Sequence, residues 1–528
     1  MRGLLLLITM LAGLSLQTAV AAGPGPARGS AVIDLLEATR MAEAEATLHK
    51  VPASDPFRPL AEALLLFHHG DYAAAAAALP PEGGEEERRL GWLRPRILAA
   101  KEVTQDFLER TEQNFIYRFA PGADAILVDY AVDALEGQRA AMARVLGQAP
   151  ERPVVVEFFP TVAEFVAASG LPPDWVETTN TVAICKWDRM LVLSPMNMGR
   201  GYPWKDTLAH EYVHLVLSRA SSNRAPIWFQ EGSAKVMESW WRKGPRPGPM
   251  QLEPYSETLL AAGLAKGRLI PFEDMHPSMA ALPSAEDASL AFAEVATAVD
   301  FLLVQLGESG YRRIVEQTAL HGDVMRAVDE VMGLVGGGFE TRWRRWLSGQ
   351  PLEARTNIVR LDESLEMGAA GRSDSEDQEL DAVLKAHRGM QDLTRVGDML
   401  RQRGHLKAAL VEYQKAAQSE PFHSPKLANK QARTLAGMGE LEFARDLLTE
   451  SVELYPEFTP TVTLLAELAW RAGDAQAAEA LAWRAVGLNP FDPGPHIVLS
   501  QVYEEAERTE EAQREKTVLS ILKTYGGW

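Results

Sequence analysis

The sequence predicts a mixed α+β domain with helical repeat regions on both sides of it. Three observations support this fold class. Glycine, alanine and proline recur at a fixed period near the C-terminus, short β-branched and aromatic stretches cluster in the middle of the chain, and a long helical region follows them. At 528 residues the chain is long enough for two to four domains, each with its own core.

The first 22 residues have the pattern of a secretory signal peptide. Arg2 supplies a positive charge, residues 4–16 form an apolar run, and small residues precede a cleavage site near Ala21 or Ala22. The run is too short for a bilayer span, although an uncleaved anchor is the alternative. No cysteine stands at the cleavage point, so we expect no lipid anchor. We predict an exported protein, periplasmic or secreted, without an integral membrane span in the mature chain.

Residues 23–112 are predicted to form one or two helical hairpins. Gly70 and Ala75 fit a helix–turn–helix unit, and Ala44, Leu48 and Pro56 fit a partial unit before it. We expect these hairpins to pack onto the domain that follows.

Residues 113–350 are predicted to form the α+β domain, a small mixed sheet followed by helices. The strand candidates are rich in β-branched and aromatic residues and lie at 115–119, 154–159, 181–187 and 189–195. Helical stretches at about 123–147 and 161–169 separate the first three, and the last two fit a hairpin through Asp188. From residue 204 to 350 the pattern is helical. Residues 363–379 are polar and contain glycine and serine, which indicates a linker over 351–388.

Residues 389–528 contain the clearest internal repeat. Pro421, Pro456 and Pro490 follow one another at 35 and 34 residues, and each is preceded at fixed spacing by a glycine and an alanine: Gly404, Gly439 and Gly473, and Ala409, Ala444 and Ala478. This period resembles the tetratricopeptide repeat, with a fourth unit near the C-terminus as a cap. The resemblance implies a concave face that binds a protein partner or an extended peptide.

The formal net charge of −19 argues against nucleic acid or an anionic membrane surface as the main partner. Cys185 is the only cysteine, so no internal disulfide forms. We interpret Cys185 as a small buried hydrophobic residue of a strand. The alternative is a reactive thiol that faces the metal site described next and occupies its open position.

Residues 210–214 carry the pattern HExxH on a helix predicted through 208–219, which Asp206 or Thr207 can cap. Residues four apart share a helix face, so His210 and His214 can direct two imidazoles at one zinc ion. Glu211 is close enough to a water on that ion to take its proton and later deliver it to a leaving amine.

A catalytic zinc needs a third protein ligand. A third histidine six residues after His214 is excluded, because Ala220 stands there, and the first aspartate after His214 is Asp274. Glutamate remains. Glu231 lies 17 residues after His214 in a second helical run, and the polar turn between the two runs could make them antiparallel. Glu238, on the same helix face, is the reserve ligand.

HEYVH followed by PIWFQEGSA resembles the glutamate-zincin (gluzincin) branch of the zinc metallopeptidases, and more narrowly the peptidase MA-like domain. The resemblance covers roughly residues 115–350 and implies a zincin-like catalytic domain with one Zn²⁺ per chain. It implies that His210, His214 and Glu231 are the metal ligands, that Glu211 is the general base, and that the substrate is a peptide or protein.

Two departures from the family pattern are Phe292, where relatives often have a tyrosine, and Lys235, where some carry a supporting aspartate. Tyr255, His276 and Tyr311 are other candidate donors to an oxyanion. In zincin folds an edge strand pairs with the substrate, and 181–187 or 189–195 would be that strand here.

Two other functions are open. One is a tetratricopeptide scaffold in the cell envelope whose protease-like zinc domain is catalytically weak or inactive. The other is hydrolysis of a non-peptide amide by the same residues.

Overall fold

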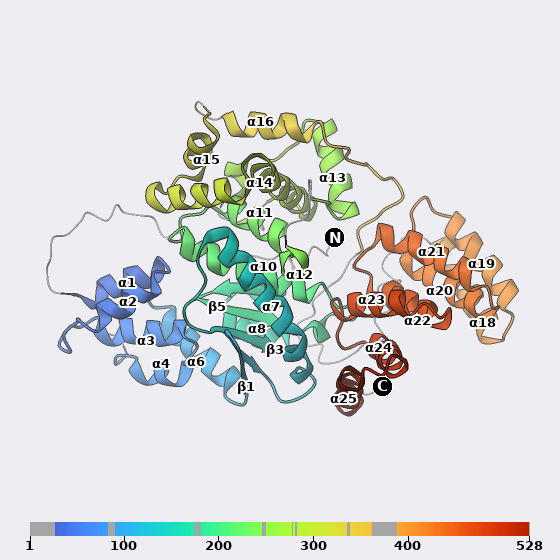
Figure 1. Ribbon diagram of the computed structural model, residues 1–528, viewed down its shortest axis with the longest axis horizontal. Helices are drawn as coiled ribbons and strands as arrows, with labels where there is room; N and C mark the ends of the chain where they lie inside the picture. The colour runs from blue at the N-terminus through green and yellow to red at the C-terminus, as the bar shows by residue number, and fades with distance from the viewer. Residues whose placement is uncertain are drawn as a thin grey trace.

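A computed structural model describes residues 27–526 apart from 83–89, 174–175, 177–180, 245–249, 277, 280–281, 335–337 and 362–387. A small sheet occupies the middle of the molecule, with the first helices on one side and the repeat helices on the other (Figure 1). A layer formed by α11 and α13–α16 covers the third side. The predicted signal peptide and most of the predicted linker lie outside the described residues.

The sheet has five strands in the order β1-β2-β3-β5-β4. The strands are β1 (Leu108–Glu112), β2 (Phe115–Phe119), β3 (Val154–Phe159), β4 (Ala183–Lys186) and β5 (Arg189–Leu193). The three central strands are parallel, whereas both edge strands are antiparallel to their neighbours. Every residue of β3 is buried, as expected for a strand covered on both faces. The predicted small mixed sheet is therefore present.

The predicted hairpin through Asp188 is confirmed. Trp187 and Asp188 have φ of 52° and 63°, and two consecutive residues with positive φ are typical of the type I′ turn that joins adjacent antiparallel strands. The pairing of Lys186 with Arg189 closes the hairpin. Because the turn is this short, β4 is held at the edge of the sheet, directly beside β5.

Helices follow the strands as predicted from residue 204 onwards. Those of the α+β domain are α7 (Ala125–Leu146), α8 (Val162–Ser169), α10 (Trp204–Ala220), α11 (Ile227–Met237), α12 (Trp240–Lys243), α13 (Pro254–Ala265), α14 (Ala285–His321), α15 (Val324–Met332) and α16 (Gly338–Leu347). α14 is long and apolar enough to cross a membrane, but 67% of its most apolar window is buried within the protein. Its contacts with α11, α13 and α15 account for this composition.

The N-terminal helices pack in hairpins against the sheet. They are α1 (Gly29–Glu37), α2 (Met41–Leu48), α3 (Arg58–His68), α4 (Tyr72–Ala78) and α6 (Leu93–Thr104). Gly70 has a φ of 74° between α3 and α4, and Ala75 is fully buried, as the predicted unit requires. The guanidinium of Arg189 on β5 lies 3.2 Å from the carboxylate of Glu157 on β3, and the hydroxyl of Tyr72 contacts both. A buried ionic contact therefore fixes these helices to the sheet.

The C-terminal part is an array of four helical hairpins. Its helices are α18 (Arg388–Gln402), α19 (Leu406–Gln418), α20 (Pro425–Gly437), α21 (Leu441–Leu454), α22 (Thr459–Arg471), α23 (Ala475–Val486), α24 (Pro493–Glu505) and α25 (Thr509–Gly526). The three predicted turn glycines all have φ between 79° and 87°, and the three predicted alanines are all fully buried. The tetratricopeptide-type repeat pattern is thus present in the fold.

The last two hairpins of the repeat array, α22–α25, share one hydrophobic core with the α+β domain. Two of the polar contacts between them come from the chain at the start of α10: the backbone N–H of Tyr202 donates to Leu488 O at 2.8 Å, and the indole N–H of Trp204 donates to Val486 O at 3.0 Å. The array is therefore a fixed part of the molecule rather than a module tethered by the linker.

The sheet begins before the predicted domain boundary at residue 113. Strand β1 (Leu108–Glu112) pairs with β2, so the α+β domain includes five residues that the sequence pattern places in the helical region. The residues of β1 are mostly exposed and charged, which explains why their sequence carries no strand signal.

Substitution of Gly201 tests the contact between the repeat array and the chain before α10. Its φ is 72°, and a Cβ at this position would overlap with the carbonyl of Leu488. We expect Gly201→Ala to lower stability by about 2–4 kcal/mol, because positive φ and steric overlap add. Gly473 has a similar φ but open space around it, so Gly473→Ala should lose only about 1 kcal/mol. Thermal unfolding of both variants checks this, and equal losses would contradict a tight docking contact.

Candidate metal centre

The helix that carries HExxH is buried along most of its length, and it begins earlier than predicted. α10 starts at Trp204 after Pro203, with no side-chain cap. Asp206, the predicted cap, lies within the first turn, where its carboxylate accepts a hydrogen bond from the indole N–H of Trp241 at 2.8 Å and pairs with Arg242. The cap prediction is wrong because the docked chain at 202–204 determines where the helix starts.

α10 and α11 are antiparallel, as the sequence predicts. Gln230 contacts Ser218 and His214, whereas Glu238, further along α11, contacts His210, nearer the start of α10. The residues with left-handed backbone at the turn are Ser222 and Asn223. This reversal brings the two histidines opposite the face of α11 that carries Glu231.

Gly232, directly after Glu231, lies where α11 contacts α14. A Cβ at this position would overlap with the backbone carbonyl of Val295 on α14. The glycine lets α11 lie directly against α14, while Glu231 on α11 faces the two histidines of α10.

The predicted ligand atoms converge. The Nε2 atoms of His210 and His214 lie 3.4 Å and 3.6 Å from Oε2 of Glu231. Two ligands bound about 2.0–2.1 Å from a tetrahedral zinc ion are about 3.3 Å apart. All three side chains are only 1% exposed. The spacing and the donor set, two imidazoles and one carboxylate, therefore fit a zinc ion.

The cluster carries opposite charges in close contact. Burial disfavours the charged imidazolium, but Glu231 and Glu238 outweigh it and raise the pKa of His210 to about 9. Burial likewise opposes ionisation of Glu231, but the two histidines hold the pKa of its carboxyl at about 2. The neighbourhood thus stabilises a positive charge beside an ionised carboxylate, a role that a metal cation can take over from a proton.

Each histidine also has a partner on its other nitrogen. Nδ1 of His210 lies 3.1 Å from Oε2 of Glu238, and Nδ1 of His214 lies 3.3 Å from Oε1 of Gln230. An Nδ1–H donated in this way fixes the ring and leaves Nε2 free to bind a metal. Among the described residues, neither Nε2 atom makes a hydrogen bond.

Glu238 is therefore not the reserve ligand that the sequence predicts. Its carboxylate contacts the ring nitrogen that faces away from Glu231, and its other oxygen lies 2.7 Å from the ammonium of Lys235. Glu238 thus contacts the outer nitrogen of His210, the kind of support that the aspartate at the position of Lys235 gives a histidine in some gluzincins. Helical spacing places Glu231 and Glu238 on one face but does not reveal which imidazole nitrogen each contacts.

Glu211 lies within the same cluster. One ligand atom from each of His210, Glu211 and His214 lies within 4.8 Å of the others. Burial raises the pKa of the Glu211 carboxyl, and the two imidazoles oppose that effect. The backbone N–H of Cys185 also lowers the pKa of this carboxyl, but burial is the largest effect. A buried carboxyl with a raised pKa beside two imidazoles has the properties of a general base.

β4 is the edge strand beside α10, which agrees with one of the two predicted strands. Cys185 lies on it and is partly buried. Burial raises the pKa of the Cys185 thiol, and the charge of Glu211 adds to the effect. A thiol kept protonated is a poor zinc ligand. This favours the interpretation of Cys185 as a small hydrophobic residue of a strand over that of a reactive thiol.

The candidate oxyanion donors do not gather at the site. The hydroxyl of Tyr311 donates to Oγ of Ser233 at 2.7 Å, and its ring stacks on Phe229. Tyr311 is therefore a core residue. Tyr255 packs against a small apolar cluster that includes Tyr455 and Phe458 of the repeat array, and His276 is exposed.

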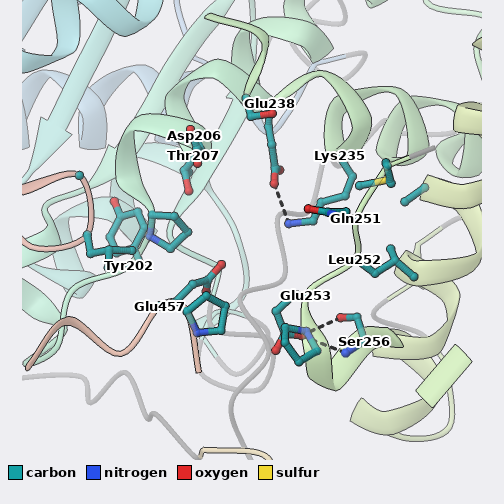
Figure 2. A pocket seen from close by; sticks show the side chains of 18 of the residues that line it. Tyr202, Asp206, Thr207, Lys235, Glu238, Gln251, Leu252, Glu253, Ser256 and Glu457 are labelled. Carbon is teal, nitrogen blue, oxygen red and sulfur yellow. Dashed lines mark hydrogen bonds and ion pairs between the residues drawn. The ribbon is translucent and has the colours of Figure 1, made fainter. Parts of the chain in front are cut away.

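A cleft of about 1580 Å³ lies beside the cluster, between the α+β domain and the repeat array. Figure 2 shows Glu238, Lys235, Asp206 and Thr207 along one wall and Glu457 of the repeats across from them. Two of these wall residues adjoin the cluster: Thr207 lies one helical turn before Glu211, and Glu238 contacts His210. None of the four predicted site residues is itself among the described residues that line the cleft.

No family model and no curated protein matches the chain. Solved structures with detectable similarity include two crystal structures of MamA. One is 21% identical over 26% of this chain and 74% of that chain, with a TM-score of 0.24, and the other is 16% identical over 29% and 93%, with a TM-score of 0.25. A third is the APC/C hetero-tetramer Cut9–Hcn1, 11% identical over 93% and 78%, with a TM-score of 0.27. At such scores the superpositions support no assignment, and the resemblance to peptidase MA-like domains stays a prediction.

Substitution of Glu238 tests whether its contact with His210 supports metal binding. Glu238→Ala removes the acceptor at Nδ1 of His210, and we expect a loss of zinc affinity of about 10–100-fold. Glu457→Gln is the matched control, because Glu457 lies across the cleft and contacts neither histidine. Competition with a chromophoric chelator measures both affinities. Equal affinity in the two variants would show that Glu238 does not support the metal site.

Proposed function

We propose that the chain is an exported zinc-dependent peptidase of the gluzincin type. The observation that carries this proposal is the convergence of His210 Nε2, His214 Nε2 and Glu231 Oε2 in a buried site, with Glu211 beside them. Buried ionisable groups of this kind are unfavourable without compensation, and a divalent cation would provide it.

The chemistry divides among the four residues. Zinc bound by His210, His214 and Glu231 would supply a Lewis acid that polarises a peptide carbonyl and acidifies a water. Glu211 takes the proton of the attacking water on its carboxylate and delivers it to the amine that leaves. Its raised pKa suits both steps, since the group must accept a proton and then release it.

β4 and the repeat array would position the substrate. An edge strand can pair with an extended polypeptide through backbone hydrogen bonds. The concave face of the repeats, fixed to the start of α10, would recruit a substrate or a partner protein.

The second candidate is an envelope scaffold in which the zinc has a structural role. Two observations favour it. The helical repeats are integrated into the main core, and the four site residues are each only 1% exposed. A closed site of this kind resembles structural zinc sites, whereas catalytic sites keep one open position.

Glu211→Gln separates the two candidates. The variant should keep about one zinc per chain, because Glu211 is not a ligand, and should lose peptide hydrolysis by about 10²–10⁴-fold. Metal content is read by mass spectrometry and hydrolysis with a fluorescence-quenched peptide library. His214→Ala is the control that should lose both.

Unchanged hydrolysis in Glu211→Gln would refute the proposed mechanism. Zinc bound by the wild type without hydrolysis of any library member would favour the scaffold.

A further inference from the structure

Lys205 is a buried cation without an anionic partner. It is only 7% exposed and lines the cleft between the α+β domain and the repeat array. Its ammonium lies 4.7 Å from the ring centre of Trp241 on α12 and 5.8 Å from that of Trp483 on α23. It makes no hydrogen bond or ion pair with any residue that the structure describes. Burial lowers the pKa of Lys205 to about 8, so the group is still mostly charged at neutral pH.

Nearby cations of the cleft are paired. Lys235 lies 2.7 Å from Glu238, and Arg242 lies 2.8 Å from Asp206. Asp133 and Asp206 attract the ammonium of Lys205 at longer range, but neither is within ion-pair distance of it. Buried ammonium groups are seldom left without an acceptor, so Lys205 is available to an anion that enters the cleft.

We propose that this cleft binds a polypeptide and that Lys205 pairs with one of its carboxylates, from an acidic side chain or from the C-terminus. The indole rings of Trp241 and Trp483 flank the ammonium and provide apolar surface for the neighbouring residues of the ligand. The two rings come from the two parts of the molecule, so only the assembled protein has this site.

The size and charge of the cleft favour a polypeptide over other anions. Its volume of about 1580 Å³ exceeds the roughly 300–1,000 Å³ of small-molecule pockets. The chain's net charge of −19 opposes nucleic acid. A mostly neutral peptide with one carboxylate adds a single negative charge, and a charge-assisted pair with Lys205 would offset its repulsion by the acidic residues of the cleft.

The inference deepens the proposed function, since the bound polypeptide would be its substrate or partner, but binding here needs no metal. The probes are three fluorescein-labelled pools of random peptides about twelve residues long. One is amidated and contains Asp and Glu, one is amidated with Asn and Gln in their place, and one has Asn and Gln with a free C-terminus. Fluorescence anisotropy with the full mature Glu211→Gln chain, which should not cleave them, measures binding.

We expect the acidic pool, the free C-terminus pool or both to bind about tenfold more tightly than the amidated Asn/Gln pool. Lys205→Gln should abolish the difference, and Lys205→Arg should retain most of it. Lys415→Gln is the control, because Lys415 pairs with Glu412 on the repeats, away from the cleft. Equal binding of all three pools, or a preference that survives Lys205→Gln, would overturn the proposal and leave the two tryptophans as the only partners of Lys205.

A measurement on unsubstituted Lys205 guards against misfolded variants. Acetylation by acetic anhydride, read by mass spectrometry, should be slowed at Lys205 by the preferred pool and not by the amidated Asn/Gln pool. Absence of protection would also overturn the proposal. If binding persists in the His214→Ala chain while no zinc binds to the wild type, the peptidase proposal fails and this one stands. If peptides are hydrolysed but no pool with a carboxylate is preferred, the peptidase proposal stands and the proposed pairing with Lys205 fails.

Discussion

The antiparallel contact between α10 and α11 is the interaction on which the site depends. It places two imidazoles and a carboxylate in a buried volume where their Nε2 and Oε2 atoms lie 3.4–3.6 Å apart. Such groups are costly to bury, and the protein surrounds them with Glu238 and Gln230 on the outer ring nitrogens. Gly232 makes the arrangement possible, because only a residue without a side chain lets α11 lie this close to α14.

The repeat array is linked to this site through the start of α10. Backbone and indole N–H groups at Tyr202 and Trp204 bond to carbonyls of the repeats, and Lys205 lies between tryptophans of both parts. The helix that carries the histidines thus begins within the interface. A polypeptide that binds in the cleft would contact the first turn of this helix, which gives a physical route from recognition by the repeats to the metal site.

Local patterns in the sequence predict much of this structure. The repeat period predicts the turns at Gly404 and Gly439, and the β4–β5 hairpin follows from two strand patterns separated only by Asp188. HExxH and the later glutamate predict that the three proposed ligands lie together, because helical spacing and one chain reversal determine their positions.

Other features depend on contacts between distant segments, and the sequence does not reveal them. The start of α10 is determined by docking at Leu488, and the role of Glu238 depends on the exact crossing of two helices. That Lys205 is buried beside Trp483 rather than beside a carboxylate depends on the docking of the repeat array, which the sequence does not reveal. Strand β1 is missed because its exposed, charged residues carry no apolar alternation.

A crystal of the mature protein grown with zinc, measured at the zinc absorption edge, tests the central claim most directly. The account predicts one strong anomalous peak between His210 Nε2, His214 Nε2 and Glu231, about 2 Å from each. The same peak should be absent from His214→Ala crystals. No peak at this position in the wild type, or zinc bound only elsewhere, would contradict a metal centre and leave the protein as a helical-repeat scaffold.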